Sequence, residues 1–222
     1  MQAILKEIQS KWKQDATEWR FWFLAIFTFI CAMLFFLNVG NYLEFIESRK
    51  GCSLDDAVLN LLTASNVSDY IFFIIYAGAV TVILYCIQSP WTILYTAQIF
   101  LLMNIIRGFC MYVTPLEPPL DIIPLHDPLL ITYVYLENPK LKDLFFSGHT
   151  ATLTVYCLIF RKQLLMQRIF KGLTIMMGFL LLIQHCHYTI DVIGAIPMAY
   201  FSYLIMRSFW KKLKLPLDKT LF

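Results

Sequence analysis

The sequence predicts an all-α, polytopic membrane protein with six transmembrane helices. Hydrophobic residues make up 59% of the 222-residue chain and aromatic residues 16%, and the mean hydropathy is +0.65. Soluble domains contain roughly 45 to 50% apolar residues. Six apolar stretches approach the length of about 20 residues that a helix needs to cross a bilayer. The lysines and arginines are divided unequally between the two sides that such spans create, as in membrane proteins.

The six predicted spans follow one another along the chain. We expect them near residues 20–38, 69–88, 90–107, 144–160, 168–185 and 190–207. The second and third meet in a tight turn at Gln88-Ser89-Pro90, and proline is well tolerated in the first turn of a helix. A cleaved signal peptide is the other interpretation of the first stretch. The charged residues before that stretch and the lack of an A-x-A-like site after it favour a span.

Positive charge sets the predicted orientation, with both termini in the cytoplasm. In this orientation 13 of the 18 lysines and arginines lie on the cytoplasmic side: Lys6, Lys11, Lys13, Arg20, Arg161, Lys162, Arg168, Lys171, Arg207, Lys211, Lys212, Lys214 and Lys219. The other 5 lie on the opposite side: Arg49, Lys50, Arg107, Lys140 and Lys142. We expect one membrane-embedded domain, residues 1–222, with a cytoplasmic segment (1–19), a non-cytoplasmic loop (108–143) and a cytoplasmic tail (208–222). The net charge of +3 reflects this topology, and no nucleic acid is expected as a partner.

Two motifs place histidines at the starts of two predicted spans. Ser147-Gly148-His149-Thr150 opens the fourth, and His187-Tyr188-Thr189-Ile190-Asp191 opens the sixth. All four histidines of the chain fall on the non-cytoplasmic side in this topology, as does Arg107; they are His126, His149, His185 and His187. Ionisable groups at membrane depth generally mark functional sites. The two motifs therefore predict an active site at the non-cytoplasmic membrane surface.

Helical spacing selects one of the two neighbouring histidines as the catalytic one. Residues four apart share a helix face, so His187 and Asp191 are neighbours, whereas His185 is six positions from Asp191 and points elsewhere. A carboxylate that binds one imidazole nitrogen fixes the tautomer and leaves the other nitrogen free to attack. We expect His187 to be a nucleophile that Asp191 orients.

The surrounding residue types suit a phosphate as the electrophile. Ser147 and Gly148 precede a helix, where free amides and the positive end of the helix dipole favour an anion. Arg107 can donate two parallel hydrogen bonds to phosphate oxygens. His149, across the phosphate from the nucleophile, can protonate the departing alkoxide as a general acid. The pattern predicts double displacement through a phosphohistidine.

A metal site is the main chemical alternative, because His185, Cys186, His187, Asp191 and His149 offer nitrogen, sulfur and oxygen ligands. Their spacing matches no standard zinc pattern, so we expect no metal and no cofactor. The six cysteines, at positions 31, 52, 86, 110, 157 and 186, show no disulfide framework spacing.

The stretch from Thr114 to Asp143 contains six prolines and resists continuous helix. They are Pro115, Pro118, Pro119, Pro124, Pro128 and Pro139. We expect this loop to lie over the mouth of the site. Glu117, His126 and Asp127 can either touch a head group there or belong to a solvated loop.

Residues 143–154 and 187–192 resemble the two catalytic motifs of the sphingomyelin synthase family, and residues 107–119 resemble the motif that precedes them. That family lies within the type 2 phosphatidic acid phosphatase superfamily. The resemblance implies a six-helix lipid phosphatase/phosphotransferase-like bundle with a His-His-Asp site on the exoplasmic face. Carried over to this chain, it makes His187 the nucleophile, Asp191 its partner and His149 the second catalytic histidine.

Members of that family move a phospho-head group from a glycerophospholipid donor to ceramide, so the resemblance implies a phospholipid and a lipid alcohol as partners. A Ser-Arg pair usually lies five residues before this histidine in the superfamily's phosphatases. It is absent here, which favours the synthase branch. No Pro-Leu-Pro-Asp-like motif lies near the first luminal loop, so the acceptor stays open. A phosphatase that uses water as acceptor, and a lipid-binding protein with a decayed site, remain the alternatives.

Overall fold

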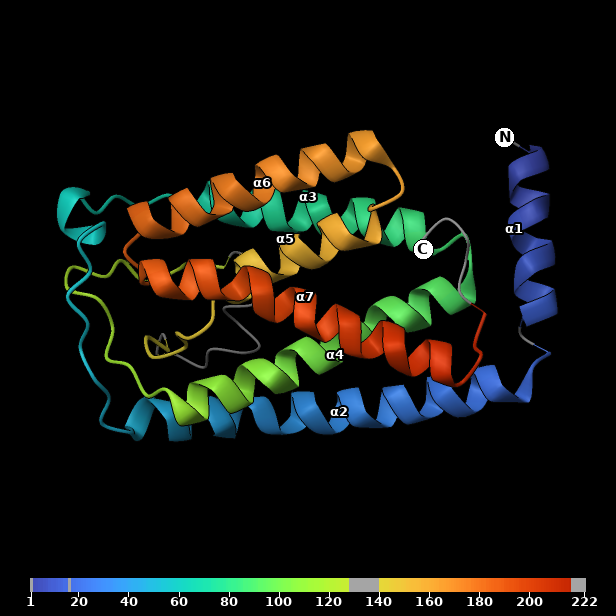
Figure 1. Ribbon diagram of the computed structural model, residues 1–222, viewed down its shortest axis with the longest axis horizontal. Helices are drawn as coiled ribbons and strands as arrows, with labels where there is room; N and C mark the ends of the chain where they lie inside the picture. Colours follow the sequence, from blue (N-terminus) through green and yellow to red (C-terminus); the bar gives the residue numbers. More distant parts are fainter. Residues whose placement is uncertain (1, 16, 128–139, 217–222) are drawn as a thin grey trace.

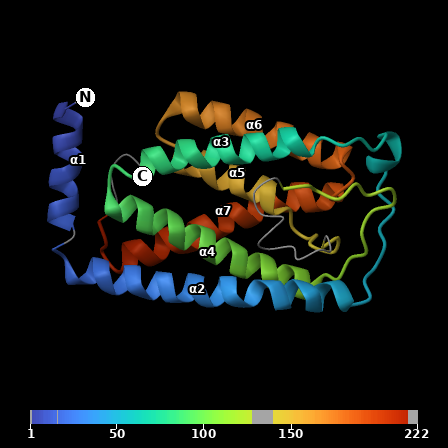
Figure 2. The ribbon, with the colours of Figure 1, turned by 180° about the vertical axis from the view of Figure 1, so that it is seen from behind.

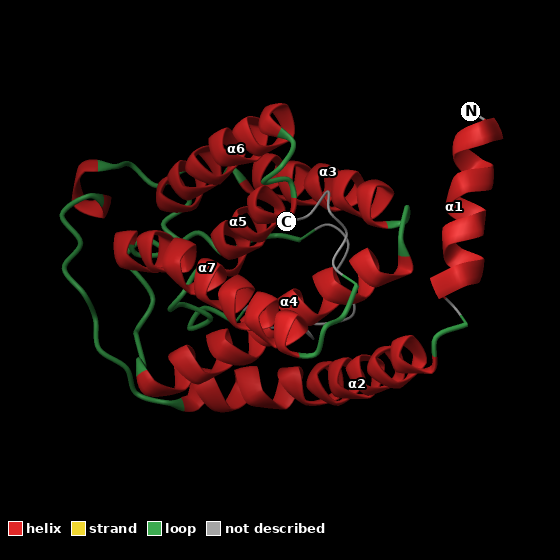
Figure 3. Cartoon of the chain, turned by 45° about the vertical axis from the view of Figure 1, so that its right-hand side comes forward, coloured by secondary structure: helices red, strands yellow, loops and turns green. Residues whose placement is uncertain are grey.

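The computed structural model describes residues 2–15, 17–127 and 140–216, and every regular element within them is a helix (Figures 1 and 3). The elements are α1 (Gln2–Asp15), α2 (Trp19–Ser48), the short 3₁₀ helix η1 (Leu59–Leu61), α3 (Ser68–Cys86), α4 (Pro90–Val113), α5 (Gly148–Ile159), α6 (Leu164–Ile183) and α7 (Thr189–Lys212). The predicted all-α class is therefore confirmed. Pro128, Asn138 and Pro139 of the proline-rich loop lie outside the described residues.

Five of the six predicted spans correspond to helices that are long and apolar enough to cross a membrane: α2, α3, α4, α6 and α7. The predicted fourth span is the exception. Its helix, α5, has 12 residues and rises only about 18 Å, because an α-helix advances 1.5 Å per residue. The residues before it, 140–147, are not helical. These helices make the chain an integral, multi-pass membrane protein.

Two helices extend beyond their predicted ends. α2 continues to Ser48 rather than residue 38, because apolar positions persist in its last turns and Leu43 and Ile46 pack against Met111 of α4. α4 continues to Val113, so Arg107 lies inside the helix and not at its end. Helix α4 thus includes residues 108–113 of the predicted loop, and α7 includes residues 208–212 of the predicted tail.

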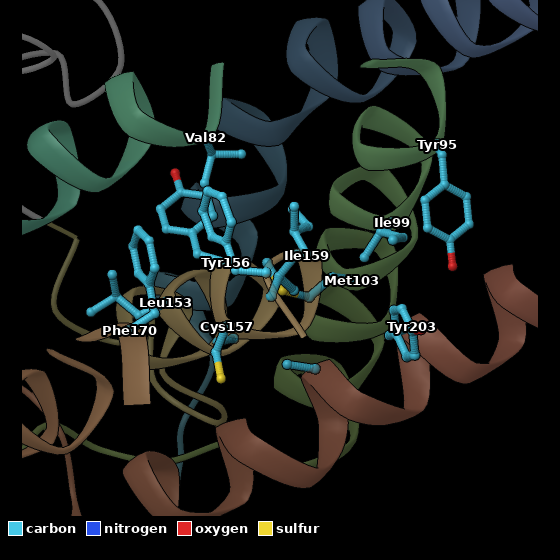
Figure 4. Close-up of a cluster of buried hydrophobic side chains, with 14 of the residues drawn as sticks. Val82, Tyr95, Ile99, Met103, Leu153, Tyr156, Cys157, Ile159, Phe170 and Tyr203 are labelled. Atoms are coloured by element: carbon cyan, nitrogen blue, oxygen red, sulfur yellow. The ribbon is translucent and has the colours of Figure 1, made fainter. Parts of the chain in front are cut away.

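The short helix α5 lies at the centre of the bundle, where the longer helices shield it from the surroundings (Figures 1 and 2). Eight of its 12 residues are buried, and its main neighbours are α6 and α7, followed by α3 and α4. Figure 4 shows Leu153, Tyr156, Cys157 and Ile159 of α5 inside this core. A helix too short to span a bilayer alone can be accommodated because protein, not lipid, surrounds it.

The outer surface of the bundle is apolar. On α2 the side chains of Phe23, Phe29 and Phe36 are 63, 69 and 72% exposed. A soluble protein rarely exposes a continuous apolar face of this size. The interior of the bundle contains paired polar groups instead. For example, Gln98 of α4 donates to the Thr28 hydroxyl at 2.9 Å and accepts from the Trp210 indole at 2.6 Å. Apolar side chains on the outside and paired polar groups on the inside are expected of helices that lipid hydrocarbon surrounds.

The helix directions bring the predicted site residues to one end of the bundle. α3, α5 and α7 begin at the same end at which α2, α4 and α6 finish, and the long connecting loops gather there (Figure 1). Helix α1 lies at the opposite end, roughly perpendicular to α2, and its Trp12 indole donates to the carbonyl of Ile87 at 2.9 Å. The first turns of α5 and α7 therefore lie near each other and far from α1.

Two loops at this end are joined by backbone hydrogen bonds. The Cys52 amide donates to the Pro115 carbonyl at 2.9 Å, and the Glu117 amide donates to the Cys52 carbonyl at 3.0 Å. Gly51 lies so close to this strand-like pairing that a Cβ on it would be 2.5 Å from the carbonyl carbon of Leu116. A side chain at position 51 would therefore force the two backbones apart.

We predict that Gly51→Ala lowers the unfolding free energy by about 1 to 3 kcal/mol, because the obstructing atoms are backbone and cannot rotate away. Gly172→Ala in α6 is the matched control. It has nothing within 4 Å of its added Cβ and should gain about 0.5 to 1 kcal/mol from helix propensity. Thermal unfolding in detergent measures both. Equal melting temperatures for the two variants would contradict this account of the loop pairing.

Candidate active site

A cavity of about 460 Å³ opens between α3, α4 and α5 at the loop end of the bundle. Loop segments 122–127, 140–143 and 186–187 complete its wall. The polar and charged residues that line it are Tyr76, Asn104, Arg107, His126, Asp127, Lys140, Asp143, His149, Thr152 and His187. An apolar wall with a few convergent polar groups is typical of a ligand site.

His187 and Asp191 are paired as the sequence predicted. The His187 Nδ1 atom lies 3.3 Å from Oδ2 of Asp191, and that oxygen also accepts the Tyr188 backbone N–H at 3.0 Å. Both side chains are buried, with Asp191 fully inaccessible. A proton on Nδ1 directed at the carboxylate leaves Nε2 as the unprotonated nitrogen. His187 also lines the cavity.

His149 lies in the first turn of α5 and lines the same cavity as His187. Its ring packs edge-on against Phe72 of α3, with the centroids 5.7 Å apart. The two predicted catalytic histidines thus come from different segments, His149 from α5 and His187 from the loop between α6 and α7, and both line one cavity. This arrangement can place one imidazole on each side of a bound group.

Arg107 reaches the cavity from α4 and is held in place by the segment that precedes α5. Its Nη2 atom forms an ion pair with Asp143 Oδ1 at 2.6 Å, and its Nε–H donates to the Phe146 carbonyl at 2.9 Å. Gly148 lies directly against it, since a Cβ at that position would be 3.3 Å from both Cζ and Nε of the guanidinium. Glycine at position 148 therefore permits the close approach of Arg107 to the start of α5.

Ser147 occupies a different place from the other predicted phosphate ligands. It is fully buried, its Oγ accepts the Thr150 amide at 3.4 Å as the N-cap of α5, and it does not line the cavity as described. Its own backbone N–H donates to the Asp191 carbonyl at 3.1 Å. Ser147 consequently joins the start of α5 to the first turn of α7, while Gly148 and Arg107 face the cavity.

Several polar residues of the cavity were not among the predicted site residues. Asn104 precedes Arg107 by three positions, a spacing that puts both on one helix face and that sequence could have indicated. Asp143 could not be assigned as the partner of Arg107, because that pairing depends on how loop 140–147 folds back on α4. The same applies to Lys140. Asp127, which the sequence left open between contact with a head group and a solvated loop, lines the cavity, and its carboxylate accepts from the Tyr76 hydroxyl at 2.5 Å.

Gln184 connects the loops around the cavity. Its side chain is fully buried, accepts the Val67 amide at 2.6 Å, and donates to the Ser68 hydroxyl at 3.0 Å and to the Ile123 carbonyl at 3.2 Å. The neighbouring His185 adopts a left-handed conformation, with φ of 53°. Its Nδ1 lies 3.3 Å from the Leu120 carbonyl, and the residue does not line the described cavity.

No group of three or more His, Cys, Asp or Glu side chains in the described part of the chain is arranged to hold a metal ion. All six cysteines are free thiols. Of these, Cys186 lines the cavity beside His187.

The comparisons with known proteins match part of the chain to one family model. Residues 142–209, which contain α5, α6 and most of α7, match the family model described as PAP2 superfamily C-terminal. No curated protein and no solved structure is similar enough to this chain to be matched. The family match supports the type 2 phosphatidic acid phosphatase superfamily, and with it a lipid phosphatase or phosphotransferase type of enzyme.

We predict that Gln184→Leu lowers the unfolding free energy by about 2 to 4 kcal/mol, since it preserves volume but leaves several buried polar groups without partners. Gln88→Leu, at an exposed position in the turn between α3 and α4, should stay within about 0.5 kcal/mol of the wild type. Chemical denaturation in detergent compares them. A Gln184→Leu protein as stable as the Gln88→Leu control would show that this network contributes little.

Proposed function

We propose that the protein is a sphingomyelin-synthase-like lipid phosphotransferase. It moves a phospho-head group from a glycerophospholipid to ceramide or a similar lipid alcohol through a phosphohistidine at His187. The observation that carries the proposal is the joint placement of His149 and the His187–Asp191 pair around one cavity that Arg107 and Gly148 also line. The family match of residues 142–209 supports the chemistry at the level of the superfamily.

The first half-reaction forms the covalent intermediate. His187 Nε2 attacks phosphorus while the bond from phosphorus to the diacylglycerol oxygen breaks. His149 donates a proton to that oxygen, so diacylglycerol leaves neutral. Burial and the nearby charges of His187 and Arg107 lower the pKa of His149 to about 4, so this step requires the negative charge of the bound phosphate to raise that pKa and favour the imidazolium. Asp191 accepts the Nδ1–H hydrogen bond and stabilises the positive charge that His187 acquires. The Arg107 guanidinium offsets charge on the phosphate oxygens.

The second half-reaction regenerates the enzyme. The hydroxyl of the acceptor attacks phosphorus, the bond between phosphorus and His187 breaks, and the now neutral His149 takes the hydroxyl proton. His187 and His149 return to their starting protonation states. With a lipid alcohol as acceptor the product is a new phosphodiester, and with water it is a phosphate monoester. The same residues therefore serve a transferase and a hydrolase.

The resemblance of residues 143–154 and 187–192 to the sphingomyelin synthase motifs favours transfer over hydrolysis. Purified protein incubated with a head-group-labelled phospholipid tests this choice. We expect label in a new sphingolipid when ceramide is supplied and little release of water-soluble label in its absence. Release of free phospho-head group at an equal rate with and without ceramide would identify a phosphohydrolase, which uses water as acceptor, instead.

His187 and Asp191 should contribute unequally to turnover. We predict that His187→Ala is essentially inactive, because it removes the covalent route. Asp191→Asn should retain a rate reduced by about 100- to 10,000-fold, because an acceptor oxygen for the Tyr188 amide remains but the charge is lost. Initial-rate assays on protein of verified folding measure both.

His185→Asn is the matched control, since asparagine tolerates positive φ and position 185 does not line the described cavity. It should keep most of its activity. A correctly folded His187→Ala protein with more than about a tenth of wild-type turnover would refute the phosphohistidine route.

We further propose that both termini are cytoplasmic and that the site faces the exoplasmic or periplasmic side. The partition of lysines and arginines supports this orientation, and the helix directions put all predicted catalytic residues at the end opposite α1 (Figure 2). The donor and acceptor lipids would then come from the outer leaflet.

Single cysteines in a background without the six native ones test the orientation. We predict that Leu61→Cys, an exposed position at the end of η1 between α2 and α3, reacts with an impermeant maleimide on intact cells. Lys162→Cys, in the exposed turn between α5 and α6, should react only after permeabilisation. The reverse labelling pattern would invert the topology and place the active site in the cytoplasm.

A further inference from the structure

A carboxylate from the loop between α2 and α3 caps the helix that follows His187. The Thr189 backbone N–H donates to Asp56 Oδ2 at 2.6 Å, and the Thr189 hydroxyl donates to Asp56 Oδ1 at 2.9 Å. Thr189 is the first residue of α7, so its amide has no acceptor within that helix. Asp56 supplies the acceptor from 133 residues away in the sequence.

Asp56 is itself fixed by its own loop. Its Oδ1 accepts the amides of Val58 and Leu59 at 3.0 and 3.3 Å, and Leu59 is buried in a small apolar cluster with Tyr188. Partial burial acts to raise the pKa of Asp56, but the hydrogen bonds from Thr189, Val58 and Leu59 outweigh it and lower the pKa below its usual value. The carboxylate is therefore ionised, and its charge also suits the positive end of the α7 dipole.

Tyr188, between His187 and Thr189, is held from both sides. Tyr188 donates its hydroxyl proton to the Glu117 carbonyl at 3.0 Å and accepts the Leu54 amide at 3.3 Å. Its backbone N–H is bound by Asp191. Asp56 fixes the next residue, Thr189. The short segment that presents His187 to the cavity thus depends on loop residues as well as on Asp191.

We propose that Asp56 is a positioning residue for phosphoryl transfer, which holds the start of α7 so that the His187 imidazole keeps its alignment with the phosphorus in the cavity. The inference rests on the proposed function of His187. Asp56 itself touches no substrate, because it does not line the described cavity. A misplacement of about 1 Å at a reacting group can lower the rate about 100-fold.

The variants Asp56→Ala and Asp56→Asn test the role, with Asp55→Ala as the matched control. Asp55 is the adjacent residue, but its carboxylate accepts from the exposed Asn60 side chain at 2.7 Å rather than from α7. We expect Asp56→Ala to lower kcat by about 10- to 100-fold with KM changed less than about threefold. Asp56→Asn, which keeps one acceptor oxygen, should recover part of the loss, and Asp55→Ala should match the wild type.

Hydrogen exchange gives a readout that does not depend on activity. Amides of residues 187–191 should exchange faster in Asp56→Ala than in wild type or Asp55→Ala, while the amides of α4 stay unchanged. If Asp56→Ala does not fold, Thr189→Ala removes only the hydroxyl bond and should show a smaller change of the same kind. Unchanged exchange at 187–191 together with unchanged kcat would overturn the inference. A wild-type protein that turns over no phospholipid would instead refute the proposed function, and exchange would still decide whether Asp56 fixes α7.

Discussion

The hydrogen bond from the Ser147 backbone N–H to the Asp191 carbonyl, at 3.1 Å, joins the two helices on which the site depends. It attaches the first turn of α7 to the residue that caps α5. His149 follows Ser147 by two positions, and His187 is bound by the side chain of Asp191. The relative position of the two histidines is therefore set by this backbone hydrogen bond together with the His187–Asp191 side-chain pair.

The bilayer imposes the second constraint. Backbone groups inside hydrocarbon must be paired within the protein, so a site with irregular segments has to be enclosed by helices. Here the non-helical residues 140–147 before α5 are tied to α4, because Arg107 pairs with Asp143 and donates to the Phe146 carbonyl. Shortening α5 to 12 residues leaves room for the cavity at its start. The core in Figure 4 shows how its apolar side chains are enclosed by α3, α4, α6 and α7.

Hydropathy predicted the five long helices well, because a helix must contain about 20 apolar residues to cross the hydrocarbon layer and such stretches are visible in the sequence. It was least accurate at α5, because Leu144, Phe145 and Phe146 are apolar but lie before the helix begins. The pairing of His187 with Asp191 was predictable from i, i+4 spacing. Ser147 was predicted beside phosphate, but the structure uses its hydroxyl as a helix cap. The Asp143–Arg107 ion pair and the Asp56 cap could not be predicted, because both join segments far apart in the sequence and leave no periodic signal.

The central claim is that His187 carries the phospho-head group between donor and acceptor. The most direct measurement is mass spectrometry of the protein after rapid mixing with a phospholipid donor in the absence of acceptor, followed by peptide analysis at neutral to alkaline pH. The account predicts a phospho-head-group adduct on His187 that disappears when a lipid alcohol is added and a new phosphodiester forms. Turnover of the donor with no adduct on His187, or with the adduct on His149, would contradict it.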